Sequence, residues 1–176
     1  MLGGWSQKAA LIPSEWGLQT LWTLWTAHLA HYSWAHLVLN LGLLCVGGFV
    51  AGLLLGRVFV MGVFLMGAPV ISLGVMLLEP HLVQFRGASG IATALIFGTV
   101  TWLWLYRASY RILLALVCLA FATKLMFDVN VGGLTVLPDS IQTSWSAHVM
   151  GALVGILLSY RVLRQGAHSV QAQMSW

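Results

Sequence analysis

Long apolar runs alternate along this chain with short polar breaks. Five of the runs are near twenty residues long, at positions 33–55, 57–78, 89–106, 111–127 and 144–160. Each could cross a hydrocarbon core about 30 Å thick as an α-helix. The runs are continuous, whereas a strand of a membrane barrel alternates apolar and polar residues, so helices are favoured. Pro69 lies inside the second run and predicts a kink there.

The segment before these runs has a different pattern. Residues 1–32 carry Lys8, Pro13 and Glu15, and no stretch of them has the length and apolar character of a span. No uninterrupted apolar core follows a basic start, so the segment does not resemble a secretory signal peptide. It is rich in tryptophan, which is enriched where membranes meet water. We therefore predict an interfacial segment and outer loop over residues 1–32.

Composition supports a membrane protein. The chain has 176 residues, of which 60% are hydrophobic and 7% are charged, whereas a soluble domain carries roughly 25% charged residues. So much apolar surface requires lipid as part of the solvent, and the expected fold is an all-α, polytopic membrane helix bundle. Cys45 and Cys118 lie inside apolar runs and predict no disulfide. No nucleic-acid partner is expected, because membrane topology accounts for the net charge of +4.

Charge orients the expected bundle. Arginines without accompanying acidic residues lie on one side of the spans, at Arg57, Arg107, Arg111, Arg161 and Arg164. Charges on the opposite side nearly balance. The positive-inside rule places the arginine side in the cytoplasm and the N-terminus outside. The bundle over residues 33–164 would then lead into a cytoplasmic tail over residues 165–176.

Four polar side chains lie near the outer ends of three predicted helices, at His36, Asn40, Ser89 and His148. Polar groups in hydrocarbon are costly and read as functional by default. Ser89 begins the third span, where unpaired helix N–H groups favour an oxyanion, and His148 could accept and return its proton. His36 and Asn40 share one helix face and could donate hydrogen bonds to that oxyanion. No carboxylate lies near His148 in the sequence, which predicts a Ser–His dyad rather than a triad.

Glycines indicate how these helices could meet. Gly87 and Gly90 flank the serine, and glycine lets a backbone bend sharply and approach a neighbour closely. Small residues recur every fourth position from Gly90 onward, and again at Gly151 and Gly155 in the fifth span. Such stripes allow membrane helices to pack closely. Close packing of these two helices would bring the serine to the histidine.

Each feature has an ordinary interpretation when it stands alone. A short Gly-x-Ser-Gly sequence is usually a helix start or a turn, and singly these features fit a structural bundle or a small transporter without chemistry. Together, three helices, one depth and complementary roles indicate a catalytic site. His28, His31 and His36 match no compact metal-ligand spacing, so no metal or cofactor is expected, and His31 is expected to brace the outer loop. Lys124 and Asp128 predict an ion pair at the outer end of the fourth span.

In their order along the chain, these residues resemble the rhomboid family of intramembrane serine proteases. The matching sequences are His-x-x-x-Asn, Gly-x-Ser-Gly and His-x-x-Gly-x-x-x-Gly, at His36–Asn40, Gly87–Gly90 and His148–Gly155. The resemblance covers residues 22–160. It implies the roles of nucleophile for the serine, base for the last histidine, and oxyanion hole for the Ser89 N–H with His36 and Asn40. The substrate would be a transmembrane protein in the lipid bilayer, and a rhomboid-like protein that binds membrane helices without cutting them is the alternative.

A narrower resemblance is to the rhombosortases, a bacterial branch of the family. It rests on residues 24–36, on Phe85–Gly90 with Pro80 upstream, and on Lys124 with Asp128. It implies a place in the bacterial inner membrane, with the site facing the periplasm and the C-terminus in the cytoplasm. The substrates it implies end in a Gly-Gly motif, an apolar helix and a basic tail, which the enzyme would remove.

Two features depart from the family pattern. The rhomboid core has six helices, and the first, which precedes the loop leading to His36, is expected to be missing here; a truncated, mis-started or minimal chain would each explain this. Many rhomboids carry a tyrosine four residues after the serine, stacked on the catalytic histidine, where this chain has Thr93. Support for His148 must then come from elsewhere. Residues 128–143 are expected to form a loop that caps the site.

Overall fold

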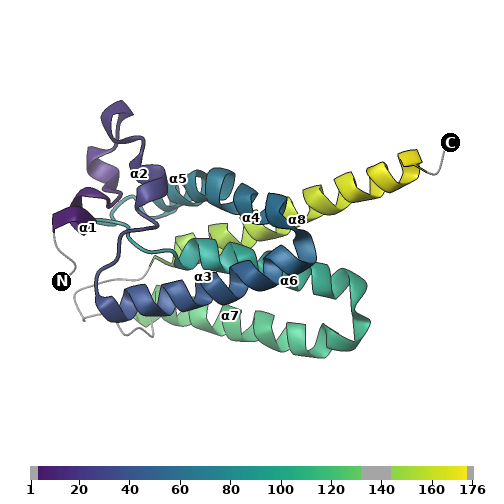
Figure 1. The fold of residues 1–176 in the computed structure, drawn as a ribbon. Coiled ribbons are helices and arrows are strands. Elements are labelled where there is room, and N and C mark those ends of the chain that lie inside the picture. The colour runs from purple at the N-terminus through teal and green to yellow at the C-terminus, as the bar shows by residue number, and fades with distance from the viewer. Residues whose placement is uncertain (1–3, 132–143, 174–176) are drawn as a thin grey trace.

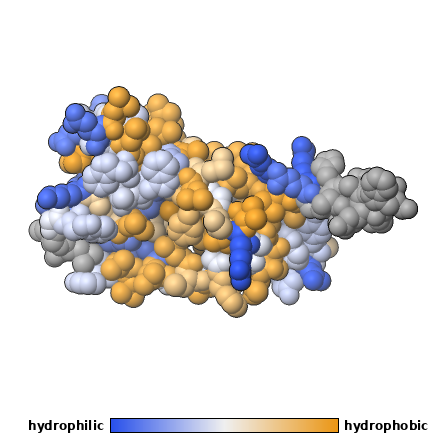
Figure 2. Space-filling view, turned by 45° about the horizontal axis from the view of Figure 1, so that its top comes forward, coloured by the Kyte–Doolittle hydropathy of each residue, from blue (hydrophilic) through white to orange (hydrophobic). Residues whose placement is uncertain are grey.

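The structure, a computed structural model, describes residues 4–131 and 144–173. Within these ranges five helices are long and apolar enough to cross a membrane, at Trp34–Leu55, Arg57–Leu78, Ser89–Tyr106, Ala108–Asn130 and Trp145–Gln165. They confirm the all-α membrane bundle with five predicted spans. On the face seen in Figure 2, apolar side chains cover the middle of the molecule, and hydrophilic side chains gather toward its two ends.

The helix that begins at the candidate nucleophile lies at the centre of the bundle (Figure 1). This helix, α6 (Ser89–Tyr106), packs most extensively against α8 (Trp145–Gln173) and next against α3 (Trp34–Leu55). Ala94 and Leu95 of α6 have no exposed surface. Because α6 is packed between α8 and α3, its position is fixed, and so is the position of the candidate site at its first turn.

The fourth span extends further than the sequence predicts. It was expected to end at Phe127, and α7 (Arg111–Val131) continues one turn beyond it. The four residues directly after Phe127 include no proline or glycine that would stop the helix. Asp128, expected in a capping loop, therefore lies in the last turn of α7, and residues 132–143 of that expected loop lie outside the described residues. The fifth span likewise continues past Tyr160, as α8.

The second span is one helix with an irregular middle. It consists of α4 (Arg57–Gly62), the π-helical turn η3 (Val63–Gly67) and α5 (Ala68–Leu78). The irregularity expected at Pro69 takes the form of this π turn, just before the proline. In an α-helix the N–H of residue 69 would donate to the carbonyl of Leu65, and proline has no N–H to give.

The N-terminal segment folds into short helical turns that lie beside α5, at the end of the bundle where α6 begins (Figure 1). Its elements are α1 (Gly4–Lys8), η1 (Pro13–Glu15), η2 (Leu18–Thr20) and α2 (Thr23–Thr26). Leu11 and Phe85 exchange two backbone hydrogen bonds, and the N–H of Gly87 donates to the carbonyl of Ala27 at 2.9 Å. The indole of Trp25 donates to Leu65 O at 3.0 Å. The segment thereby holds the strand-like turn that leads into α6.

Candidate active site

The turn before α6 approaches α3 so closely that it requires a glycine. Gly87 has φ +124°, a backbone conformation that L side chains rarely adopt. A Cβ at this position would lie 2.8 Å from His36 Cε1 and 3.7 Å from Asn40 Nδ2. His36 and Asn40, one turn apart on α3, therefore both face the turn that leads into Ser89.

Neighbouring residues fix the position of the His36 side chain. Ser33 caps α3 by accepting the His36 backbone N–H at 3.1 Å. The His36 ring stacks on Tyr32 with centroids 5.8 Å apart, and the His31 ring meets it edge-on at 5.0 Å. Asn40 is 3% exposed, and its Nδ2 has no hydrogen-bond partner among the described residues. An amide donor buried beside the serine turn is suited to receive an oxyanion.

Tyr32 belongs to a further cluster at the outer edge of the site. Its hydroxyl donates to Gln84 O at 2.8 Å, and the Arg86 guanidinium carbon lies 5.1 Å from its ring centre. Arg86 Nη2 in turn donates to Gln84 Oε1 at 2.5 Å. Burial raises the pKa of Tyr32 to about 12, so its hydroxyl stays protonated as a donor. Through the stacked rings this cluster fixes the orientation of His36.

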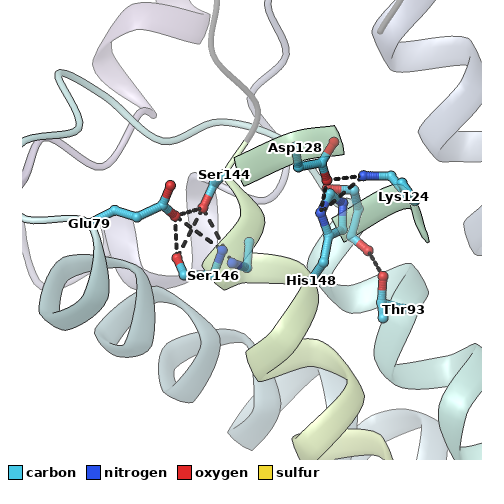
Figure 3. A network of polar contacts seen from close by, with 9 residues as sticks. Glu79, Thr93, Lys124, Asp128, Ser144, Ser146 and His148 are labelled. Carbon is cyan, nitrogen blue, oxygen red and sulfur yellow. Dashed lines mark hydrogen bonds and ion pairs between the residues drawn. The ribbon is translucent and has the colours of Figure 1, made fainter. Parts of the chain in front are cut away.

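Ser89 is the first residue of α6 and is half-buried. As the first helical residue, its N–H has no partner within the helix and carries part of the positive end of the helix dipole. Thr93, where many rhomboid-like sequences have tyrosine, donates its hydroxyl to the Ser89 carbonyl oxygen at 2.8 Å (Figure 3). Thr93 therefore bonds to the backbone of its own helix.

The first turns of α6 and α8 pack against each other with their backbones in close contact. A Cβ at Gly90 would lie 2.9 Å from the carbonyl oxygen of Ala147, and a Cβ at Gly151 would run into the carbonyl oxygen of Gly90. One turn further on, Gly155 receives the Ala94 carbonyl in the same way. Ser89 and His148 each adjoin this contact in sequence, so the structure places them at the same junction. No hydrogen bond between the Ser89 hydroxyl and the His148 ring occurs among the described residues.

The other ring nitrogen of His148 meets charged side chains of α7. Its Nδ1 lies 3.3 Å from Asp128 Oδ2 and 3.3 Å from Lys124 Nζ, and Lys124 and Asp128 form the ion pair that the sequence predicts (Figure 3). No carboxylate lies near His148 in the sequence, but the fold brings Asp128 next to its ring, a contact that the predicted Ser–His dyad does not include. Twenty positions separate Asp128 from His148 in the sequence, and only the i, i+4 spacing to Lys124 could have drawn attention to Asp128.

The carboxylate of Glu79, the residue that directly follows α5, fixes the start of α8. Glu79 Oε2 accepts the Ser144 hydroxyl at 2.5 Å and the Ser146 backbone N–H at 3.2 Å, and it also contacts the Ser146 hydroxyl. Ser144 Oγ accepts the Ala147 N–H at 3.3 Å. A carboxylate at a helix N-terminus satisfies unpaired N–H groups and complements the helix dipole. Sequence reasoning assigned Glu79 no such role, because its partners follow it by more than sixty residues.

His28 is a structural side chain of the N-terminal segment. Its Nε2 lies 3.0 Å from Ala68 O and 3.1 Å from Ser72 Oγ, and Ser72 donates to Leu24 O at 2.8 Å. Burial lowers the pKa of His28 to about 4, so the ring is neutral at pH 7. His31 is tied to the same segment through Ser6, whose hydroxyl donates to the His31 carbonyl at 2.7 Å. These histidines brace the outer segment.

Taken together, the first turns of α3, α6 and α8 offer a serine hydroxyl, an imidazole, and N–H donors within one small region. Such a set suits acyl transfer, in which a hydroxyl attacks a carbonyl, a base takes its proton and donors receive the oxyanion. The groups lie in helices that can cross a membrane, so the carbonyl would belong to a chain that reaches this depth.

Comparison with known proteins identifies one family. A family model described as the Rhomboid domain matches residues 18–165, which is most of the chain and includes every residue of the candidate site. No curated protein matches the chain in sequence.

Proposed function

Because the chain belongs to the rhomboid family, whose members are generally intramembrane serine proteases, we propose that it is an intramembrane serine endopeptidase. The observation that carries this proposal is the close backbone approach of Gly90 to Ala147. It brings the helix that begins at Ser89 against the helix turn that carries His148. A structural bundle has no need to place a serine and a histidine next to the same helix contact.

The proposed reaction begins with attack of Ser89 Oγ on a substrate carbonyl carbon. His148 Nε2 accepts the hydroxyl proton as the new C–O bond forms, and later gives it to the leaving amine as the C–N bond breaks. Water then attacks the acyl-enzyme, with His148 again moving the proton, and releases the new carboxyl end. The Ser89 N–H, His36 and Asn40 would donate to the tetrahedral oxyanion. One such donor is typically worth about 3 kcal/mol in the transition state.

The substrate and the location of the reaction follow from the same resemblance as narrower proposals. The substrate would be a transmembrane protein whose tail combines a Gly-Gly motif, an apolar helix and a basic end, cut at the periplasmic face of the bacterial inner membrane. Support comes from the rhombosortase-like residues around His31 and Arg86, which lie beside the site. A substrate in which Gly-Gly is replaced by Val-Val should be cut at least tenfold more slowly than the parent, and equal rates would reject this specificity.

Purified protein in detergent or liposomes, incubated with a fluorescent transmembrane substrate, tests the activity itself. Ser89→Ala and His148→Gln should each abolish cleavage, because each removes a group that handles the reacting atoms. Ser109→Ala is a matched control, since Ser109 is an exposed serine in a short turn at the opposite end of α6. Cleavage retained by Ser89→Ala would refute the proposal.

A rhomboid-like protein that binds membrane helices without cutting them is the second candidate. The observation in its favour is that, among the described residues, no hydrogen bond joins the Ser89 hydroxyl to the His148 ring. Catalytic hydrogen bonds are often long before substrate binds. Labelling by a serine-reactive fluorophosphonate separates the two candidates: a protease is labelled at Ser89, and a helix-binding protein is not labelled.

A further inference from the structure

Next to the Nδ1 atom of His148, α7 supplies a carboxylate and an ammonium group (Figure 3). Asp128 Oδ2 and Lys124 Nζ each lie 3.3 Å from His148 Nδ1. The Asp128 side chain has no exposed surface, whereas that of Lys124 is 38% exposed. The three groups thus contact one another, and the buried carboxylate lies beside both the partly exposed ammonium group and the imidazole ring.

The two α7 groups would have opposite effects on the imidazole. A carboxylate accepts hydrogen bonds, so contact with Asp128 favours a proton on Nδ1 and leaves the Nε2 lone pair free to act as a base. An ammonium group donates, so contact with Lys124 alone would favour a proton on Nε2, and that tautomer cannot take the proton of Ser89. Lys124 is already engaged with Asp128 in the ion pair. The arrangement therefore favours the tautomer that a base requires.

We propose that Asp128 is a positioning residue for His148, completing a Ser89–His148–Asp128 triad in which Lys124 keeps the carboxylate ionised. This inference rests on the proposed protease function and adds a third side chain to its catalytic pair. When Nε2 takes the Ser89 proton, Nδ1–H stays bonded to Asp128, which stabilises the imidazolium and does not itself become protonated. The proton then passes from Nε2 to the leaving amine.

The surroundings of the ring give Asp128 this role rather than another acid. Glu79, which directly follows α5, and His36 of α3 are the other titratable groups of the described residues that act on His148 through space. Glu79 is bound to Ser144 and Ser146 at the start of α8. A buried carboxylate is retained only where partners offset its lost hydration. Lys124, one turn earlier on the same face of α7, is such a partner.

Three variants separate a role in positioning His148 from a role as the mere partner of Lys124. Asp128→Asn keeps the shape of the side chain but removes the charge, and the matching change in soluble proteases with this triad costs about 10⁴-fold in kcat. Here we expect kcat to fall at least tenfold, with KM changed less than threefold. Adding Lys124→Met to Asp128→Asn should leave kcat still at least tenfold below wild type. Asn130→Ala, an exposed change close by on α7, should leave kcat unchanged.

Recovery of the double variant to within twofold of wild type would overturn the proposal, because it would show that Asp128 serves only to neutralise Lys124. Wild-type kcat in Asp128→Asn would overturn it too. Ser89→Ala is measured in parallel: if it still cuts, the protease function itself fails, whereas if it is inactive and Asp128→Asn is fully active, only the triad fails.

A measurement on the wild-type protein tests the role of Asp128 even if a variant fails to fold. Long-range nitrogen–proton NMR correlations of ¹⁵N-histidine protein show which ring nitrogen carries the proton, and the His148 signals are assigned by their loss in His148→Gln. We expect the neutral His148 ring to carry its proton on Nδ1. A proton on Nε2 would overturn the proposal whatever the kinetics of the variants.

Discussion

At the scale of single residues, burial makes His28 sensitive to acid. Its Nε2 is bonded to Ala68 O and Ser72 Oγ inside the packed outer segment, and burial lowers the pKa of His28 to about 4. The unfolded chain has the ordinary value near 6.5 and therefore binds more protons than the folded protein between these two pH values. The contribution of neutral His28 to the free energy of unfolding is thus fully present above pH 6.5 and is lost as pH falls toward 4. A pKa difference of this size amounts to about 3 kcal/mol at the acid end.

Thermal unfolding in detergent micelles between pH 7.5 and 4.5 measures this loss. We expect the melting temperature of the wild type to fall through this range, and that of His28→Gln to fall less, because glutamine can donate to the same oxygens but does not titrate. His81→Gln serves as the control, since His81 is exposed. Equal pH dependence in His28→Gln and wild type would contradict this account.

The sequence identifies some residues of the site and misses others for a physical reason. A polar residue in an apolar span is conspicuous wherever its partners lie, so His36, Asn40 and Ser89 could be found without a structure. Asp128 and Glu79 lie at helix ends, where charges are ordinary. Their importance comes from contacts at the start of α8, and no local pattern encodes a contact between residues so far apart in the sequence.

At the scale of elements, the second span and the N-terminal segment depend on each other. Pro69 leaves the Leu65 carbonyl without the N–H that an α-helix would provide, and Trp25 of the outer segment donates its indole N–H to that oxygen at 3.0 Å. The sequence predicts the helix irregularity at the proline. It does not predict the hydrogen bond to the Leu65 carbonyl, because the donor lies forty residues away. A defect in one element is thus satisfied by a side chain of another.

A double-mutant cycle tests this coupling. Trp25→Phe should cost about 1 kcal/mol from the lost hydrogen bond, and it should cost less in a Pro69→Ala background, where the new N–H can serve the Leu65 carbonyl. Trp22→Phe is the matched control, because the Trp22 indole bonds locally to Gln19 O, and its cost should be the same in both backgrounds. Additive costs for Trp25→Phe and Pro69→Ala would show that the two sites are independent.

At the scale of the whole molecule, the five spans follow closely from the sequence. Hydrocarbon forces the backbone to satisfy itself within each helix, so apolar length alone predicts where the spans begin and end to within a few residues. The packing order of the spans does not follow from length. The central place of α6 results from glycine contacts with α8, such as Gly151 against the Gly90 carbonyl. These contacts confirm the close packing of the two helices that the stripes of small residues predict.

The orientation of the bundle is a further prediction at this scale. The turns and helix ends opposite Ser89 carry five arginines, at Arg57, Arg107, Arg111, Arg161 and Arg164. Translocating such clusters is unfavourable, so this end should stay in the cytoplasm and the site should face outward. In a bacterial host, green fluorescent protein fused after residue 176 should fluoresce and alkaline phosphatase fused there should be inactive. Phosphatase fused after Pro80, between α5 and α6, should be active, and the reverse pattern would place the site on the cytoplasmic side.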